Sequence, residues 1–146
     1  MANCLGILRE LQNSPNRESD DALILKAVME QLEIIKVKTA LLTPEEADRA
    51  DLSGWDMIVP MCESYPRLMR LKSAAGKDVI MVNPPQSVLN CYRTNMIAAF
   101  KAYPEINLPP TEVRRASGAG RTAPAFGWQG GVWLKRGDVH NTCSHD

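Results

Sequence analysis

The sequence predicts an α/β fold in which helices flank an open parallel sheet. Short apolar runs alternate with helical patterns through residue 102, and this alternation is typical of βαβ units. Right-handed crossovers would then bring the loops that follow the strands to one edge of the sheet, the usual ligand-binding edge. The predicted strands are Cys4–Leu8, Ile34–Leu42, Asp56–Met61 and Asp78–Val82.

Capping residues and apolar spacing predict the helices between these strands. Ser19, Asp20 and Asp21 offer N-caps and an acidic first turn to the first helix, whose apolar residues follow at helical spacing. Thr43 and Glu46 form a capping box, with proline at the first helical position. The predicted helices are Asp20–Leu32, a short one from Thr43 to about Arg49, Glu63–Ala75 and Gln86–Ala102.

The pattern changes after Pro109-Pro110, which divides the chain into two predicted domains, 1–109 and 110–146. The second domain contains no helical pattern, so we expect an incomplete β-rich lobe. In it, Gly131–Lys135 predicts a short buried strand, and Asp138–Thr142 predicts a second strand that would pair with it as a hairpin.

Composition excludes several classes of function. Among 146 residues, Lys and Arg number 17, as do Asp and Glu, so no basic excess favours nucleic acid or an anionic membrane surface. No apolar run approaches the ~20 residues that span a bilayer, and no signal-like stretch begins the chain. The four cysteines form no C-x-x-C pair. They therefore indicate reduced thiols and a cytoplasmic protein.

Two basic residues are candidates for phosphate binding. Lys135 leaves the predicted buried strand into a turn that contains Gly137, where its ammonium group could meet an anion. The alternative is an ordinary surface hairpin with a solvated tip. Arg93 is the second candidate, and its alternative is an exposed helix arginine.

Glu10 and Glu63 are the carboxylates of greatest interest. Each comes just after an apolar strand, where a parallel sheet presents ligand-binding groups. The alternative is that both are solvated loop acids, or charges favoured by a helix N-terminus.

Other motifs give no site. Gly118-Ala-Gly120 opens no helix, so it is not a dinucleotide fingerprint, and Cys62 has no histidine nearby in the sequence to activate it. The cluster His140, Cys143, His145 and Asp146 is too cramped for zinc, and a disordered terminus accounts for it better. We therefore assign no catalytic and no metal-binding residue.

The order of the motifs resembles that of ATP-grasp proteins. The resemblance covers essentially the whole chain: an N-terminal, Rossmann-like pre-ATP-grasp domain and the beginning of the nucleotide-binding domain. The segments that carry it are Leu8-Arg-Glu10 with Ser14-Pro-Asn16, Pro60-Met-Cys-Glu-Ser64, Asn83-Pro-Pro-Gln-Ser-Val-Leu-Asn-Cys-Tyr-Arg93, Leu108-Pro-Pro-Thr111 and Val132-Trp-Leu-Lys-Arg-Gly-Asp138.

This resemblance implies a role for each candidate residue. Lys135 looks like the lysine that holds ATP phosphates, and Arg93 stands where many members have lysine. Glu10 and Ser14 look similar to the loop that contacts the amino substrate in D-alanine–D-alanine ligases, and Glu63 would line the same substrate edge. ATP and Mg²⁺ would be the cofactors of the full-length enzyme, with metal ligands supplied from outside this chain.

The function implied is the N-terminal part of an ATP-dependent ligase that joins a carboxylate to an amine or similar nucleophile through an acyl phosphate. Small carboxylates and amines would be its partners, and a homodimer is among the alternatives left open. The chain ends inside the first ATP-grasp subdomain, so we expect a fragment with little activity of its own. The rival interpretation is a non-catalytic Rossmann-like module that binds a protein partner or a small molecule.

Overall fold

The computed structural model describes residues 2–11, 18–74, 76, 78–115, 130–131 and 133–137. The chain divides into two compact units, which meet between Leu89 and Asn90. The predicted boundary at Pro109-Pro110 falls inside the second unit.

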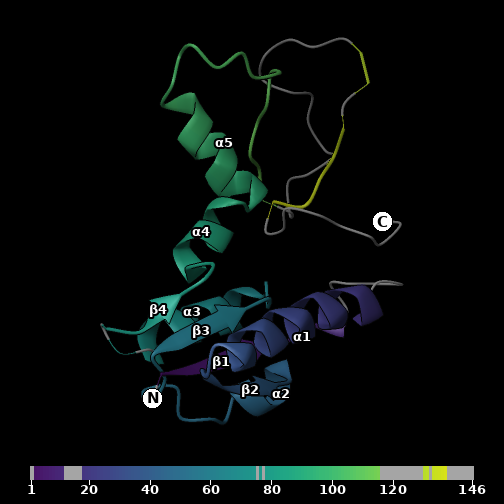
Figure 1. The fold of residues 1–146 in the computed structure, drawn as a ribbon. Helices are drawn as coiled ribbons and strands as arrows, with labels where there is room; N and C mark the ends of the chain where they lie inside the picture. The colour runs from purple at the N-terminus through teal and green to yellow at the C-terminus, as the bar shows by residue number, and fades with distance from the viewer. Residues whose placement is uncertain are drawn as a thin grey trace. The chain divides into compact units, whose positions relative to one another are not determined.

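The first unit contains a four-stranded parallel sheet, as the alternation of strands and helices predicts (Figure 1). The strand order is β2-β1-β3-β4, so β1 and β3 are the central strands. The bounds are β1 Asn3–Ile7, β2 Lys38–Leu42, β3 Met57–Pro60 and β4 Ile80–Met81. In register, Ile7 pairs with Leu42 on one side and with Pro60 on the other, so these three strands end together at one edge.

Helices cover both faces of the sheet. Helix α1 (Glu18–Ile34) packs Leu25 and Met29 against Cys4 on one face. On the other face, helix α2 (Pro44–Ala47) and helix α3 (Tyr65–Ala74) contribute Ala47 and Leu71 to a larger core. That core also includes Leu5, Ile7, Leu52, Ile58 and Cys62. The alternation of Cys4 and Leu5 between the two faces follows the period of two in a strand.

Gly6 allows α1 to approach the sheet closely. A Cβ atom at this position would lie 2.6 Å from Cδ2 of Leu41 and 3.3 Å from Cδ2 of Leu25. The residues of α1 that face the sheet are Leu25 and Met29, whereas Leu23, Ile24 and Val28 are exposed. Helix α1 therefore carries exposed apolar side chains in addition to those that it packs against the sheet.

The capping box at Thr43 is confirmed. Thr43 Oγ1 accepts a hydrogen bond from the backbone N–H of Glu46 at 3.2 Å, and Glu46 Oε2 accepts one from the N–H of Thr43 at 2.8 Å. The predicted strand Ile34–Leu42 is wrong in its first half, because α1 continues to Ile34 and β2 begins only at Lys38. Between them Lys36 adopts a left-handed φ of 67°, a conformation that ends a helix and turns the chain.

The predicted single helix Gln86–Ala102 is also wrong. It is divided into α4 (Pro85–Asn90) and α5 (Arg93–Lys101). Tyr92, which is 7% exposed, has an extended backbone (φ −62°, ψ 136°) and serves as the N-cap residue of α5. Helical periodicity in the sequence continues across such a break, so it does not reveal the extended residue.

The second unit contains α5 and extended segments. The predicted buried strand Gly131–Lys135 is wrong for the residues that the structure describes there, since none is in a strand and Trp133 is 91% exposed. A strand needs a hydrogen-bonded neighbour for its backbone groups. The neighbour that the sequence predicts, Asp138–Thr142, lies outside the described residues, as do Ser14, the Gly118–Gly120 loop and the histidines of the C-terminal cluster.

Candidate functional site at the strand-end edge

The parallel topology brings Glu10 and Glu63 to the same edge of the sheet. Each follows its strand by three residues, and the strands β1 and β3 are neighbours. The backbone N–H of Glu63 donates a hydrogen bond to Oε2 of Glu10 at 2.9 Å. The expectation that both acids lie at one edge is therefore met, whereas their roles in substrate binding stay predictions.

Glu10 is buried, and both of its carboxylate oxygens accept hydrogen bonds. Its side chain is 3% exposed, and Oε1 accepts a hydrogen bond from the N–H of Ser64 at 3.1 Å. Burial acts to raise the pKa of this carboxyl, but the hydrogen bonds from Glu63 and Ser64 outweigh it and hold the pKa below its ordinary value of 4.5. Glu10 is therefore a carboxylate at neutral pH.

The partners of Glu10 explain why a charged group is stable there. Glu63 and Ser64 immediately precede α3, so the Glu10 carboxylate lies beside the N-terminal, positive end of that helix. Glu10 thus joins the end of β1 to the start of α3. Its contacts fit a residue that holds the β3–α3 loop in place rather than one that touches a ligand directly.

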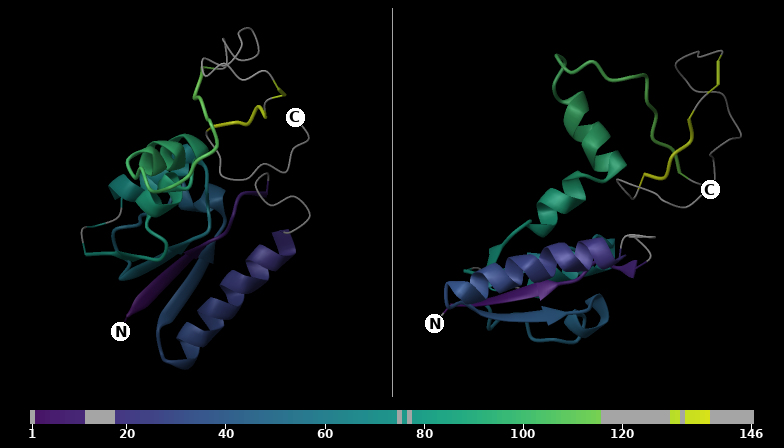
Figure 2. Two further views of the ribbon diagram at one scale, coloured as in Figure 1. Left: turned by 90° about the horizontal axis from the view of Figure 1, so that it is seen from above. Right: turned by 45° about the vertical axis from the view of Figure 1, so that its right-hand side comes forward.

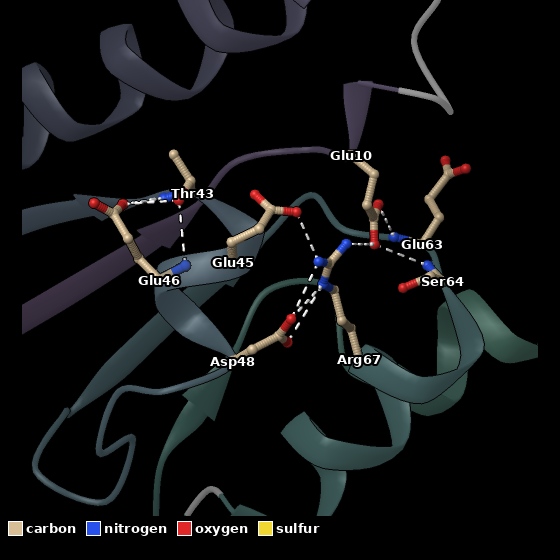
Figure 3. Close-up of polar contacts among 8 residues, drawn as sticks. All are labelled: Glu10, Thr43, Glu45, Glu46, Asp48, Glu63, Ser64 and Arg67. Atoms are coloured by element: carbon tan, nitrogen blue, oxygen red, sulfur yellow. Dashed lines mark hydrogen bonds and ion pairs between the residues drawn. The ribbon is translucent and has the colours of Figure 1, made fainter.

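Arg67 extends this network along the edge (Figure 3). Its Nη1 lies 3.4 Å from Glu10 Oε1, and its Nη2 lies 2.8 Å from Glu45 Oε1 and 3.1 Å from Asp48 Oδ2. Partial burial acts to lower the pKa of Arg67, but Asp48 and Glu10 outweigh it and raise the pKa above its ordinary value. Arg67 therefore remains a fixed cation that ties α2 to α3.

The side chain of Glu63 points away from the Glu10 carboxylate (Figure 3). Its Oε1 pairs with Nη2 of Arg9, whose Nη1 lies 3.4 Å from Oδ2 of Asp21. The side chains of these three residues are 18–20% exposed, so solvent reaches this part of the edge while Glu10 is covered. The Nε atom of Arg9 is buried without a hydrogen-bond partner among the described residues.

The ion pairs of this network join five carboxylates and two guanidinium groups. Burial within it is uneven, because the side chain of Glu10 is 3% exposed whereas those of Asp48 and Glu45 are 41% and 68% exposed. The residues are Glu10, Asp21, Glu45, Asp48 and Glu63 with Arg9 and Arg67.

Cys62 lies beside this network but is unsuited to nucleophilic catalysis. It is 2% exposed, and burial together with the nearby Glu10 carboxylate raises the pKa of its thiol to about 12. Since the thiolate is the reactive form, the buried thiol is inert near neutral pH. The part of the chain that the structure describes contains no group of three or more His, Cys, Asp and Glu side chains that could hold a metal ion.

The two candidate phosphate ligands belong to the second unit. Arg93 is the first residue of α5, and its Nη1 donates a hydrogen bond to the carbonyl of Arg136 at 3.0 Å. Thr94 binds the next carbonyl, that of Gly137, through both its N–H and its Oγ1 at 3.1 Å. The start of α5 therefore holds the segment that immediately follows Lys135, and Lys135 itself is exposed.

Sequence reasoning missed most of the ion-pair network. Arg67, Glu45, Asp48 and Asp21 were not singled out, because each meets its partner across elements that are distant in the chain. No local spacing signals the ion pairs of Arg67, since Asp48 is 19 residues away and its other partners are farther along the chain.

Comparisons of the chain with protein-family models, with curated proteins and with solved structures found no match. Among the described residues, no helix combines the length and the apolar character needed to cross a membrane.

Proposed function

We propose that this chain is the N-terminal part of an ATP-dependent ligase that joins a carboxylate to an amine, similar to ATP-grasp enzymes, with a Rossmann-like first domain. The observation that carries the proposal is the joining of Glu10 and Glu63 at the strand-end edge of a parallel sheet, through the Glu63 N–H. Such edges are where open α/β sheets bind small molecules. The type of reaction is proposed from the resemblance of the chain's motifs to those of ATP-grasp proteins.

The edge is suited to an amine substrate. The Glu63 carboxylate is partly exposed, so it would accept hydrogen bonds from a substrate ammonium group. Arg9 would then be free to rotate toward a substrate carboxylate, which a guanidinium binds in bidentate fashion. Glu10 would act as a positioning residue, because both of its oxygens hold the loop that carries Glu63.

The second unit would provide cations for phosphate groups. Arg93 is held close to the segment that follows Lys135, which favours a shared role for the two side chains. When bound, ATP supplies the phosphoryl group that activates a substrate carboxylate, and the amine then displaces phosphate from the acyl carbon. Because the described residues include no cluster fit for Mg²⁺, we derive no step through the metal.

A thermal-shift panel tests this proposal. Amino acids, diamines and small carboxylates would be added with and without Mg-ATP to the wild-type chain, to Glu63→Gln, to Lys135→Ala and to the control Glu30→Gln. Glu30 is exposed on α1, away from the edge. A ligand that binds only the folded state raises Tm. We expect a small amine to raise Tm in the wild type and the control but not in Glu63→Gln.

Two results would contradict the proposal. One is an amine-induced rise in Tm that Glu63→Gln leaves unchanged, which would place the amine elsewhere. The other is the absence of any stabilising amine in the panel. An amine that binds at Glu63, with no effect of Mg-ATP that depends on Lys135, would instead favour the rival small-molecule-binding module.

A further inference from the structure

Exposed apolar side chains lie along the outer side of α1 and are interrupted there by Gln31. Five large aliphatic side chains on this side are between 40% and 68% exposed, and Ala27 lies among them. They are Leu23, Ile24, Val28, Ile34 and, just after the helix, Ile35. Single exposed apolar residues are common on soluble proteins, but a contiguous group of this kind marks an interaction surface.

The spacing of this surface fits a helical partner. Ile24, Ala27, Gln31 and Ile34 follow one another at intervals of three, four and three residues, the seam spacing of helices that pack side by side. Figure 2 shows α1 lengthwise on the sheet, with no described element of the first unit across its outer side. A helix of 17 residues presents a seam roughly 25 Å long.

Exposed charges of opposite sign lie near the two ends of α1, although the last turn itself also carries Glu33. Asp20 lies in the first turn, whereas Lys36 and Lys38 follow the last. Neither Asp20 nor Lys36 makes a side-chain ion pair with a described residue. If two copies of α1 pack antiparallel about a twofold axis near Val28, the acid of each copy faces the lysines of the other. A parallel pair would place like charges together.

We propose that the outer face of α1 binds a second copy of this chain as an antiparallel helix pair. Lys26 and Glu30 on the flank of the helix would form the polar rim. The footprint of one helix is small for a protein interface, so we expect a reversible dimer with a Kd on the order of 10 µM. This inference is independent of the proposed ligase function, because the surface is made by α1 and not by the strand-end edge.

Sedimentation velocity over protein concentrations that span this Kd tests the dimer. Ile24→Lys places a charge in the seam and should leave a monomer throughout. Met69→Lys is the matched control: Met69 is 39% exposed on α3, and its replacement should leave dimerisation unchanged. Circular dichroism of each variant checks that it is folded. Both substitutions are at exposed positions, where the cost to stability is small.

A charge exchange distinguishes self-association from binding of another partner. Asp20→Lys and Lys36→Asp should each weaken the dimer roughly tenfold, since each places like charges at both ends of the symmetric pair. Aspartate tolerates the left-handed conformation of position 36. The double variant should recover most of the wild-type affinity. A wild-type chain that is monomeric at every concentration, a dimer that survives Ile24→Lys, or a double variant no better than the single ones would overturn the proposal.

Discussion

The carboxylate of Glu10 accepts a hydrogen bond from the backbone N–H of Glu63, 53 residues later in the chain, at 2.9 Å. This contact fixes the end of β1 to the loop between β3 and α3. A buried charge with its hydrogen bonds intact is stable, whereas loss of the charge leaves backbone donors less well satisfied.

Glu10→Gln should therefore destabilise the first unit. The amide retains one acceptor oxygen, but its NH₂ group would face a backbone N–H, so we expect a loss of about 2–3 kcal/mol in the free energy of unfolding. Urea denaturation followed by circular dichroism measures it. Glu30→Gln, at an exposed position, should change stability by less than about 0.5 kcal/mol. Equal stability of the two variants would show that Glu10 does not hold this loop.

Acid should remove the contribution of Glu10 to the free energy of unfolding. Its pKa in the folded state is lowered from the ordinary value of 4.5, so its stabilisation is fully present above that pH and is lost as the pH falls through the lowered pKa. The difference in unfolding free energy between wild type and Glu10→Gln should be constant near neutral pH and shrink below 4.5. A difference that grows on acidification would contradict the assigned charge state.

The described cysteines should differ sharply in reactivity. Cys91 is exposed, whereas Cys4 and Cys62 are buried and their thiol pKa values are raised by burial. Brief alkylation of the native protein should label Cys91 and spare the other two, and denaturant should expose all three. Peptide mass spectrometry assigns the modified sites. Rapid labelling of Cys62 in the native state would be inconsistent with its position in the core.

Gly137 should be intolerant of a side chain because of Thr94. A Cβ atom at position 137 would lie 2.5 Å from Cγ2 of Thr94, and a β-branched residue has little freedom to move aside. Gly137→Ala should therefore weaken the bond from the Thr94 N–H to the Gly137 carbonyl, by roughly 1 kcal/mol. Hydrogen exchange at the Thr94 amide reports this bond.

Thr94→Ser provides the compensating change. Serine lacks Cγ2 but keeps the hydroxyl group that binds the Gly137 carbonyl. In the double variant Thr94→Ser with Gly137→Ala, protection of this amide should return toward the wild-type level. If exchange at position 94 is unaffected by Gly137→Ala, the start of α5 does not hold the segment after Lys135.

The sequence predicts the parallel sheet well because each strand and helix carries a local signal. Cys4–Leu8 is apolar over the length of a strand, and Thr43 with Glu46 is a complete helix-start motif. The errors occur where the secondary structure of a segment depends on the backbone angles of one residue or on a partner that is distant in the chain. Lys36 in the left-handed region and Tyr92 in the extended region interrupt patterns that look continuous.

The candidate site could likewise be predicted in part. Topology alone places Glu10 and Glu63 at one edge, because both follow strands that are neighbours in the sheet. The ion pairs of Arg67 could not be predicted, since they depend on how α2 and α3 lie beside each other. For the same reason the sequence did not show that Glu10 is enclosed while Glu63 reaches solvent.

The most direct test of the central claim is a ¹⁵N-resolved NMR titration of the wild-type chain with the amine that raises Tm most. The amide N–H of Glu63 sits between the buried Glu10 carboxylate and its own partly exposed side chain, so it reports ligand binding at this edge. We expect the amide signals of Arg9, Glu63 and Ser64 to shift in parallel as amine is added and to reach a plateau. In Glu63→Gln these shifts should disappear. Saturating shifts confined to other parts of the chain would contradict the assignment of this edge as the substrate site.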